Sequence, residues 1–330
     1  MRNTIGFSPY LRNMSKSAIH IQTTPTHFKY VYNLINSMKK IKHIESIEIF
    51  IVLDTMKELA SFKAGLKLPD KMINLSLVTL EEIVEKLNLN YKESYTEIIN
   101  SDKKLEIFWG AGGHRDFVAI KRTYSILYIK SLGYDYCWCL DSESFILDRF
   151  DINDFFKTNS TNNILLIGTG VSGVRYPELL NSLFNFDKKT LNRLRKINIR
   201  MNDFWFINTS VFNDLVDYLF EKYKKPISYF MNGSEQSLYE YFLYSLFINN
   251  EIEINLFKLN GDMHENNLFS EVIKNPKTFN NLSKFLNEQY FNNTYSYRGD
   301  YIKILETTQY GKMLLKKLNI KIAVSNYQGF

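Results

Sequence analysis

The sequence contains few cysteines and few prolines. Only Cys137 and Cys139 occur in 330 residues, too few for a disulfide scaffold. Their spacing of two on one predicted strand favours buried free thiols in a reducing compartment, since a zinc site would need two further ligands and no histidine or other cysteine lies close in sequence. Six prolines against 22 tyrosines and 25 phenylalanines exclude a disordered chain.

Long apolar runs and long basic runs are also missing. No run approaches the roughly 18 apolar residues of a membrane span, and the N-terminus has no apolar signal-peptide core. We therefore expect a soluble, cytoplasmic protein. Its 41 basic and 35 acidic residues give a net charge of +6, which suits an anionic ligand. Peripheral contact with the inner face of a membrane stays open, whereas no basic stripe indicates nucleic-acid binding.

Apolar strands alternate with amphipathic helices over most of the chain. We predict strands at 18–23, 47–53, 73–78, 134–140, 164–168, 203–207 and 252–259. We predict helices at 28–38, 56–66, 80–87, 117–127, 152–156, 178–200 and 213–223. This alternation predicts an α/β fold with a mainly parallel sheet covered by helices on both faces, followed by a polar and partly helical C-terminal part.

One predicted strand ends in two carboxylates. The stretch from Tyr134 to Ser144 begins apolar and aromatic and ends with Asp141 and Glu143. Because strand side chains alternate between faces, these two would share a face if the extended conformation persists. Two oxygen ligands suit Mg²⁺ or Mn²⁺, which could hold the phosphates of a nucleotide. The alternative is a strand that ends in a polar turn, since Asp and Ser are ordinary turn residues.

Basic side chains and glycines precede this strand. Three glycines in 110–113 allow close backbone approach and lead to His114 and Arg115, which we place in a loop near an anionic donor or in a plain connection. Lys121 and Arg122 follow near the start of the next helix. They could contact phosphates or simply form a charged helix surface.

In this order, the features at roughly residues 18–265 resemble a glycosyltransferase of the GT-A fold, and bacterial capsule and lipopolysaccharide transferases are the most similar in character. In that family an α/β sheet ends in an Asp-x-Asp motif that grips a metal and the diphosphate of a sugar nucleotide. Asp141-Ser142-Glu143 matches this motif, with Glu in the second position, and the helix that carries Lys121 and Arg122 precedes it.

The resemblance implies further site residues. Asn208 and Thr209 match a strand that lines the sugar and acceptor pocket, although an extra Ile precedes them and Ser210 replaces a glycine. Glu235 matches an acidic residue that would deprotonate the acceptor in an inverting enzyme or bind the donor sugar in a retaining one; a helix first-turn acid is the alternative. His264 could complete the metal shell, although its Gly-Asp-Met-His-Glu context departs from the usual signature.

These features together predict a metal-dependent glycosyltransferase that uses Mn²⁺ or Mg²⁺, a nucleotide-sugar donor and a glycan or lipid-linked acceptor in surface polysaccharide synthesis. Residues 1–265 would form the catalytic domain, with a nucleotide-binding part at 18–150 and an acceptor part at 151–265. Residues 266–330 would form a helical extension packed on it. The alternatives are a sugar nucleotidyltransferase and a non-catalytic carbohydrate- or nucleic-acid-binding protein. The former usually carries a glycine-rich loop at its first strand, and 21–25 has no glycine.

Overall fold

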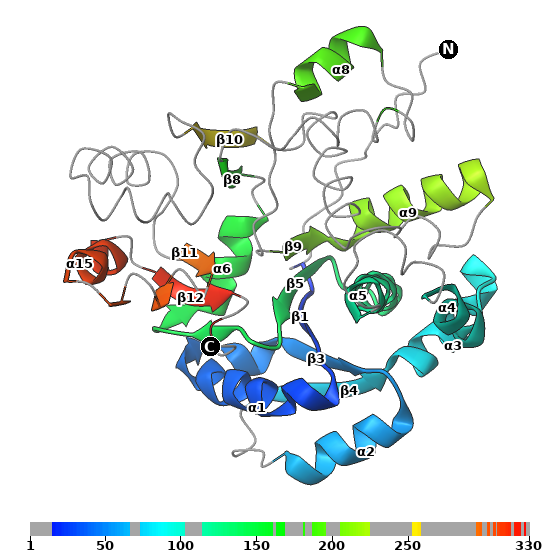
Figure 1. Cartoon of the computed structure of the whole chain (residues 1–330), viewed down its shortest axis with the longest axis horizontal. Helices are drawn as coiled ribbons and strands as arrows, with labels where there is room; N and C mark the ends of the chain where they lie inside the picture. Colours follow the sequence, from blue (N-terminus) through cyan, green and yellow to red (C-terminus); the bar gives the residue numbers. More distant parts are fainter. Residues whose placement is uncertain are drawn as a thin grey trace.

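A five-stranded sheet lies at the centre of the computed structural model (Figure 1). The structure describes residues 15–66, 73–102, 114–160, 163–168, 181, 187–195, 205–224, 253–258, 295–298, 302–303, 306–307, 309–317, 320–324 and 327. The strand order of the central sheet is β4-β3-β1-β5-β9. Its strands are β1 (Ser17–Gln22), β3 (Glu48–Leu53), β4 (Asn74–Thr79), β5 (Tyr136–Asp141) and β9 (Trp205–Asn208). The first four are parallel, and β9 is antiparallel to β5.

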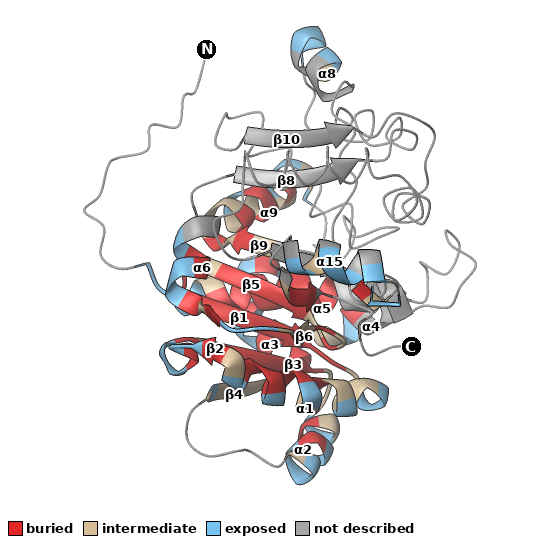
Figure 2. Cartoon of the chain, turned by 90° about the vertical axis from the view of Figure 1, so that its left-hand side faces the viewer, coloured by how far each residue is buried: buried red, intermediate tan, exposed pale blue. Residues whose placement is uncertain are grey.

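Helices cover both faces of this sheet, which confirms the predicted α/β architecture with a mainly parallel sheet. One face packs on α1 (Phe28–Ser37), α2 (Met56–Gly65) and α6 (Ile152–Asn159), whose apolar side chains share a core with Ile21 and Trp138. The other face packs on α5 (His114–Ser131), which contacts α3 (Leu80–Tyr91) and α9 (Thr209–Tyr223). Figure 2 shows the buried residues concentrated in the sheet and in the helix faces against it.

The inner strands β1, β3 and β5 are buried on both faces, as expected of parallel strands between helix layers, whereas the edge strand β4 is mostly half-buried. Every residue of β1 is buried. In β5, Trp138 packs on Phe155 of α6, with ring centroids 4.4 Å apart, while Cys137 and Cys139 alternate with it and face the other layer. Both cysteines are buried and free, as the sequence predicted. A sheet that is packed on both faces holds its strand ends in fixed positions, so functional groups at those ends are also held in place.

Smaller elements surround the central sheet. Two strands pair in parallel in each of two further sheets: β8 (Asn163–Gly168) with β10 (Glu253–Lys258), and β2 (Ile41–Lys42) with β7 (Phe150–Asp151). A third sheet contains β11 (Tyr295–Arg298), β12 (Ile320–Val324) and β6 (Phe145–Ile146). The remaining elements are η1 (Pro25–His27), η2 (Met38–Lys40), η3 (Ile44–Ser46), α4 (Tyr95–Asp102), α8 (Lys188–Arg195) and α15 (Gln309–Lys317). The C-terminal part therefore contributes strands as well as a helix.

Helix starts follow local capping chemistry. Thr79 and Glu82 form a capping box that begins α3. The Asn208 side chain accepts hydrogen bonds from the Ser210 and Val211 amides, so α9 begins at Thr209, four residues before the predicted start. None of the helices in the described ranges has the length and apolar character that crossing a membrane requires.

Candidate functional site

The carboxyl ends of β1 and β5 meet where the strand order of the sheet reverses. From β1 the chain proceeds outward to β3 and β4, and then returns to place β5 on the other side of β1. Ligands of open α/β sheets bind at such a switch point, outside the carboxyl ends of the strands. Gln22, the last residue of β1, pairs in register with Asp141, the last residue of β5. Asp141 therefore lies at the position that this topology favours for a ligand.

A tight turn follows Asp141. The Ser144 amide donates a hydrogen bond to the Asp141 carbonyl over 2.9 Å, so residues 142–143 are not extended. The expected continuation of the strand is therefore wrong, and strand alternation does not bring the two carboxylates together. Glu143 instead approaches His27 of η1, with 3.8 Å between Oε1 and Nε2. The other ring nitrogen of His27 lies 2.9 Å from the Ser142 hydroxyl, so one imidazole contacts both turn residues.

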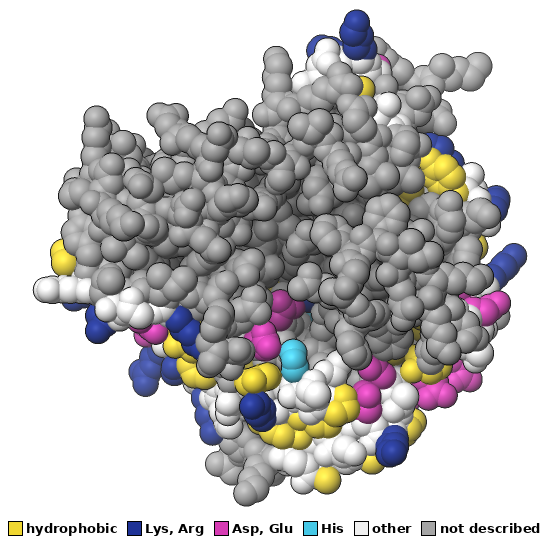
Figure 3. All heavy atoms as spheres, viewed as in Figure 1, with side chains coloured by type: hydrophobic (Ala, Val, Ile, Leu, Met, Phe, Trp, Pro, Cys, Tyr) yellow, Lys and Arg dark blue, Asp and Glu magenta, His cyan; other side chains and the backbone are white. Residues whose placement is uncertain are grey.

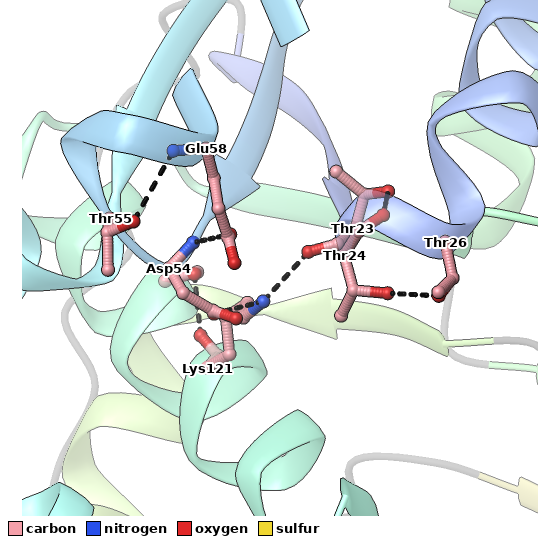
Figure 4. A network of polar contacts seen from close by, with 8 residues as sticks. Thr23, Thr24, Thr26, Asp54, Thr55, Glu58 and Lys121 are labelled. Atoms are coloured by element: carbon pink, nitrogen blue, oxygen red, sulfur yellow. Dashed lines mark hydrogen bonds and ion pairs between the residues drawn. The ribbon is translucent and has the colours of Figure 1, made fainter. Parts of the chain in front are cut away.

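Arg122 and Lys121 reach the strand ends from α5. Arg122 is buried and pairs with Asp141, which is 34% exposed. Lys121 is buried as well, pairs with Asp54 just after β3 and donates to the Thr23 carbonyl over 2.9 Å (Figure 4). Burying a cation is costly unless it is paired and hydrogen-bonded, so these side chains are not ordinary surface charges. Both side chains are part of the buried structure next to the switch point.

Acidic groups shape the electrostatics beside β3. The Asp54 amide donates to Glu58 Oε2 over 2.9 Å, and burial raises the pKa of Glu58. Burial, together with the negative charges of Asp54, Glu81 and Glu58, raises the pKa of Tyr95 to about 12. Figure 3 shows acidic side chains beside a histidine on this face of the molecule. Anionic ligands would therefore need the buried cations or a bound metal ion to bind here.

Asp141 and Glu143 fit a substrate-bridged cation better than a closed metal cage. Within the part of the chain that the structure describes, no three His, Cys, Asp or Glu residues are grouped closely enough to hold a metal ion. Mg²⁺ commonly uses one or two protein carboxylates and takes its other ligands from substrate phosphates and water. Two partly accessible carboxylates at a strand end meet that requirement. His264, the third predicted ligand, lies outside the described residues.

The structure does not bring Asn208 and Thr209 to the carboxylates. Because β9 runs antiparallel to β5, Asn208 pairs with Tyr136, at the opposite end of β5 from Asp141. The Asn208 side chain caps α9, and the buried Thr209 hydroxyl donates to the Tyr134 carbonyl. Their polar groups thus serve the local structure, at the opposite end of β5 from Asp141.

Three other predicted residues cannot be located as site groups. His114 and Arg115 lie in the first turn of α5 rather than in a loop, and their side chains fall outside the described part of the chain. Glu235 lies outside it entirely.

The sequence interpretation missed Thr23, His27 and Asp54. Neither His27 nor Asp54 belongs to a sequence motif that indicates a site. A signal was present: Thr23 ends the predicted strand 18–23, His27 lies four residues after it, and Asp54 directly follows the predicted strand 47–53. The carboxyl ends of parallel strands share one edge, so these residues were candidates by position.

No protein-family model matches the sequence, and no significant match occurs among curated protein sequences. Among solved structures, mouse xyloside xylosyltransferase 1 is similar over 94% of this chain and 98% of its own, at 8% identity and a TM-score of 0.45. Core-mannan synthase A from Aspergillus fumigatus, in a Mn/GDP form, is similar over 76% and 74%, at 11% identity and 0.40. The S. cerevisiae mannosyltransferase Ktr4p in complex with GDP is similar over 73% and 69%, at 10% identity and 0.41. Similarities this distant assign no activity to the chain.

Proposed function

We propose that the chain is a metal-dependent glycosyltransferase of GT-A type, which moves a sugar from a nucleotide-sugar donor to a hydroxyl acceptor. The observation that carries this proposal is the position of Asp141 at the switch point of the sheet, where it pairs with the buried Arg122 and where Glu143 follows in the next turn. Two carboxylates and a buried cation at one strand end suit a metal–diphosphate group, which carries both signs of charge.

Sugar transfer needs stabilisation of the diphosphate that leaves. A bound Mn²⁺ or Mg²⁺ would act as a Lewis acid on the phosphate oxygens and would be held by Asp141 and Glu143. Arg122 would orient the diphosphate through its permanent positive charge, which lies beside Asp141 at the end of β5. Lys121 would hold Asp54 and the Thr23 carbonyl in fixed positions, which leaves a rigid polar wall at the ends of β1 and β3.

The acceptor side of the proposal rests on the family resemblance. The acceptor would be a glycan or a lipid-linked sugar in surface polysaccharide synthesis, with residues 1–265 as the catalytic domain and 266–330 as an extension. Glu235 would deprotonate the acceptor hydroxyl and His264 would add a metal ligand. Substituting each with Gln separates these roles, since Glu235→Gln should spare Mn²⁺ binding and His264→Gln should weaken it.

A thermal-shift screen with nucleoside diphosphates tests the proposal. Nucleotide and Mn²⁺ together should raise the melting temperature of the wild-type chain, and Asp141→Asn should abolish that rise. Asp154→Asn, which removes an exposed carboxylate of α6, is the matched control and should retain it. No shift with any nucleotide and metal would overturn the proposal.

The products then identify the reaction. A transferase should slowly hydrolyse its own nucleotide sugar and release the nucleoside diphosphate. A nucleotidyltransferase would instead form pyrophosphate from a nucleoside triphosphate and a sugar 1-phosphate. Release of pyrophosphate would therefore reject the proposed reaction even if Asp141 binds the metal.

A further inference from the structure

The C-terminal strand β12 pairs with β6, which begins two residues after Glu143. Ile322 pairs with Ile146 and Ala323 pairs with Phe145, in antiparallel register. The pairing continues beyond β6, because the Lys321 carbonyl accepts hydrogen bonds from the amides of residues 147 and 148, over 2.8 and 3.2 Å. Ile146, Ile322 and Ala323 are completely buried. Strand β12 thus packs directly on the segment that follows the turn with Asp141 and Glu143.

Side chains reinforce this pairing. The rings of Phe145 and Tyr327 stack with centroids 5.4 Å apart and planes 20° from parallel. Lys303 lies over the Tyr327 ring, with Nζ 5.4 Å from the centroid. Lys321 forms an ion pair with Asp148. Tyr327 therefore holds Phe145 and, through it, the segment immediately after the carboxylate turn.

Ser37 and Lys40 hold the opposite edge of the same segment. The Ile146 amide donates to the Ser37 hydroxyl over 3.0 Å. Lys40 Nζ donates to the carbonyls of Ile146 and Leu147, over 2.9 and 3.2 Å. A two-residue strand has too few ladder hydrogen bonds to fix its own register, so its neighbours must set it. Here α1 and η2 supply one edge and β12 supplies the other.

We propose that β12 and Tyr327 are positioning elements for the turn that carries Asp141 and Glu143. This inference rests on the proposed function, in which those carboxylates hold the metal and the diphosphate. Ligands of a metal must stay within about 0.5 Å of the productive geometry, and such precision comes from the packing that supports them. The C-terminal segment packs on Phe145 and Ile146, which directly follow the turn that carries Glu143, whereas α5 contacts Asp141 through Arg122.

Tyr327 offers a direct test in the full-length chain. Tyr327→Ala removes the stacked ring, Tyr327→Phe retains it, and Met313→Ala changes an exposed side chain of α15 as the control. Mn²⁺ affinity is measured by electron paramagnetic resonance with a saturating nucleoside diphosphate, because the phosphates supply part of the metal's ligands. Tyr327→Ala should bind Mn²⁺ about tenfold more weakly, since loss of supporting contacts commonly costs 10–100-fold in metal affinity. Tyr327→Phe and Met313→Ala should stay within about twofold of wild type. Equal affinities for the Ala and Phe variants would overturn the inference.

Amide hydrogen exchange separates this inference from the proposed function. The amides of residues 146–148 should exchange faster in Tyr327→Ala than in Tyr327→Phe, with no ligand present. Lys321→Met, which removes the ion pair with Asp148, should accelerate the same amides and serves as a second variant if Tyr327→Ala fails to fold. A wild-type chain that binds neither Mn²⁺ nor nucleotide would overturn the proposed function. Unchanged exchange in both variants would overturn the positioning role.

Discussion

Lys121 and Arg122 are neighbours on α5, yet they pair with carboxylates at the ends of two different strands. Lys121 contacts Asp54 after β3, whereas Arg122 contacts Asp141 at the end of β5, and β1 lies between these strands. Successive residues of a helix point about 100° apart, which allows one helix to reach both sides of β1. Helix α5 thus contacts the carboxyl ends of β3 and β5, the two strands on either side of β1.

The Lys121–Asp54 pair should be strongly coupled. Lys121→Met should lower the free energy of unfolding by about 3 kcal/mol, because it leaves the mostly buried Asp54 carboxylate without its cation. Asp54→Asn, added to Lys121→Met, should restore part of this loss, since the uncompensated charge is removed. Urea denaturation of the two single variants and the double variant measures the coupling. Simple additivity of the single effects would show that the pair is not coupled.

Arg122 should act mainly on the phosphates. Arg122→Met should weaken binding of a nucleoside diphosphate by about 10–100-fold, the range expected for lost hydrogen bonds to a charged group. Binding of the corresponding nucleoside should change by less than about threefold. Titration calorimetry with both ligands measures the difference, and Lys157→Met, which changes an exposed side chain of α6, is the control. If the nucleoside and the nucleoside diphosphate lost the same factor in affinity, Arg122 would act only by supporting Asp141 and not by contacting the phosphates.

Local patterns sufficed to predict the architecture. The apolar runs of β1, β3 and β5 and the helical spacing of α1, α2 and α5 are properties of short segments, and packing preserves them. The location of Asp141 at the end of a strand was predictable for the same reason. It ends an apolar strand of a parallel sheet, and such strands end at one common edge.

Features that depend on distant pairing could not be predicted. The family resemblance implies that Asn208 lines the sugar and acceptor pocket, but the residues of a strand do not specify its direction in the sheet, and β9 is antiparallel to β5. Glu143 was expected on an extended strand, whereas the turn after Asp141 redirects it toward His27. His27 acquires a role only through contact with residues more than 100 positions away.

His27 should set the position of Glu143. His27→Ala should weaken Mn²⁺ binding about tenfold, because both turn residues lose a contact, while the free energy of unfolding changes by less than about 0.5 kcal/mol at this half-exposed position. Glu143→Gln should weaken Mn²⁺ binding at least as much, since it removes a proposed ligand. Paramagnetic resonance measures both affinities. His43→Ala is a matched control, because His43 is also exposed and also lies beside carboxylates. An equal loss of affinity in the His43 variant would contradict the assignment.

The pKa of Asp148 should report the attachment of the C-terminal strand. The hydrogen bond from Lys321, helped by the Arg149 amide, lowers the pKa of the Asp148 carboxyl below its usual value. A lowered carboxyl pKa contributes stability that is present above the unfolded value of about 4 and is lost as the pH falls through the folded value. Lys321→Met should therefore move the pKa of Asp148 up toward that ordinary value and reduce the pH dependence of stability below pH 4. Carbon NMR titration of the Asp148 carboxyl measures this, with the exposed Asp154 as an internal reference that should not change. An identical titration of Asp148 in the wild type and in Lys321→Met would mean that the Lys321–Asp148 ion pair does not form in solution. The backbone pairing of β12 and the Tyr327 ring would then have to hold the C-terminal strand without that ion pair.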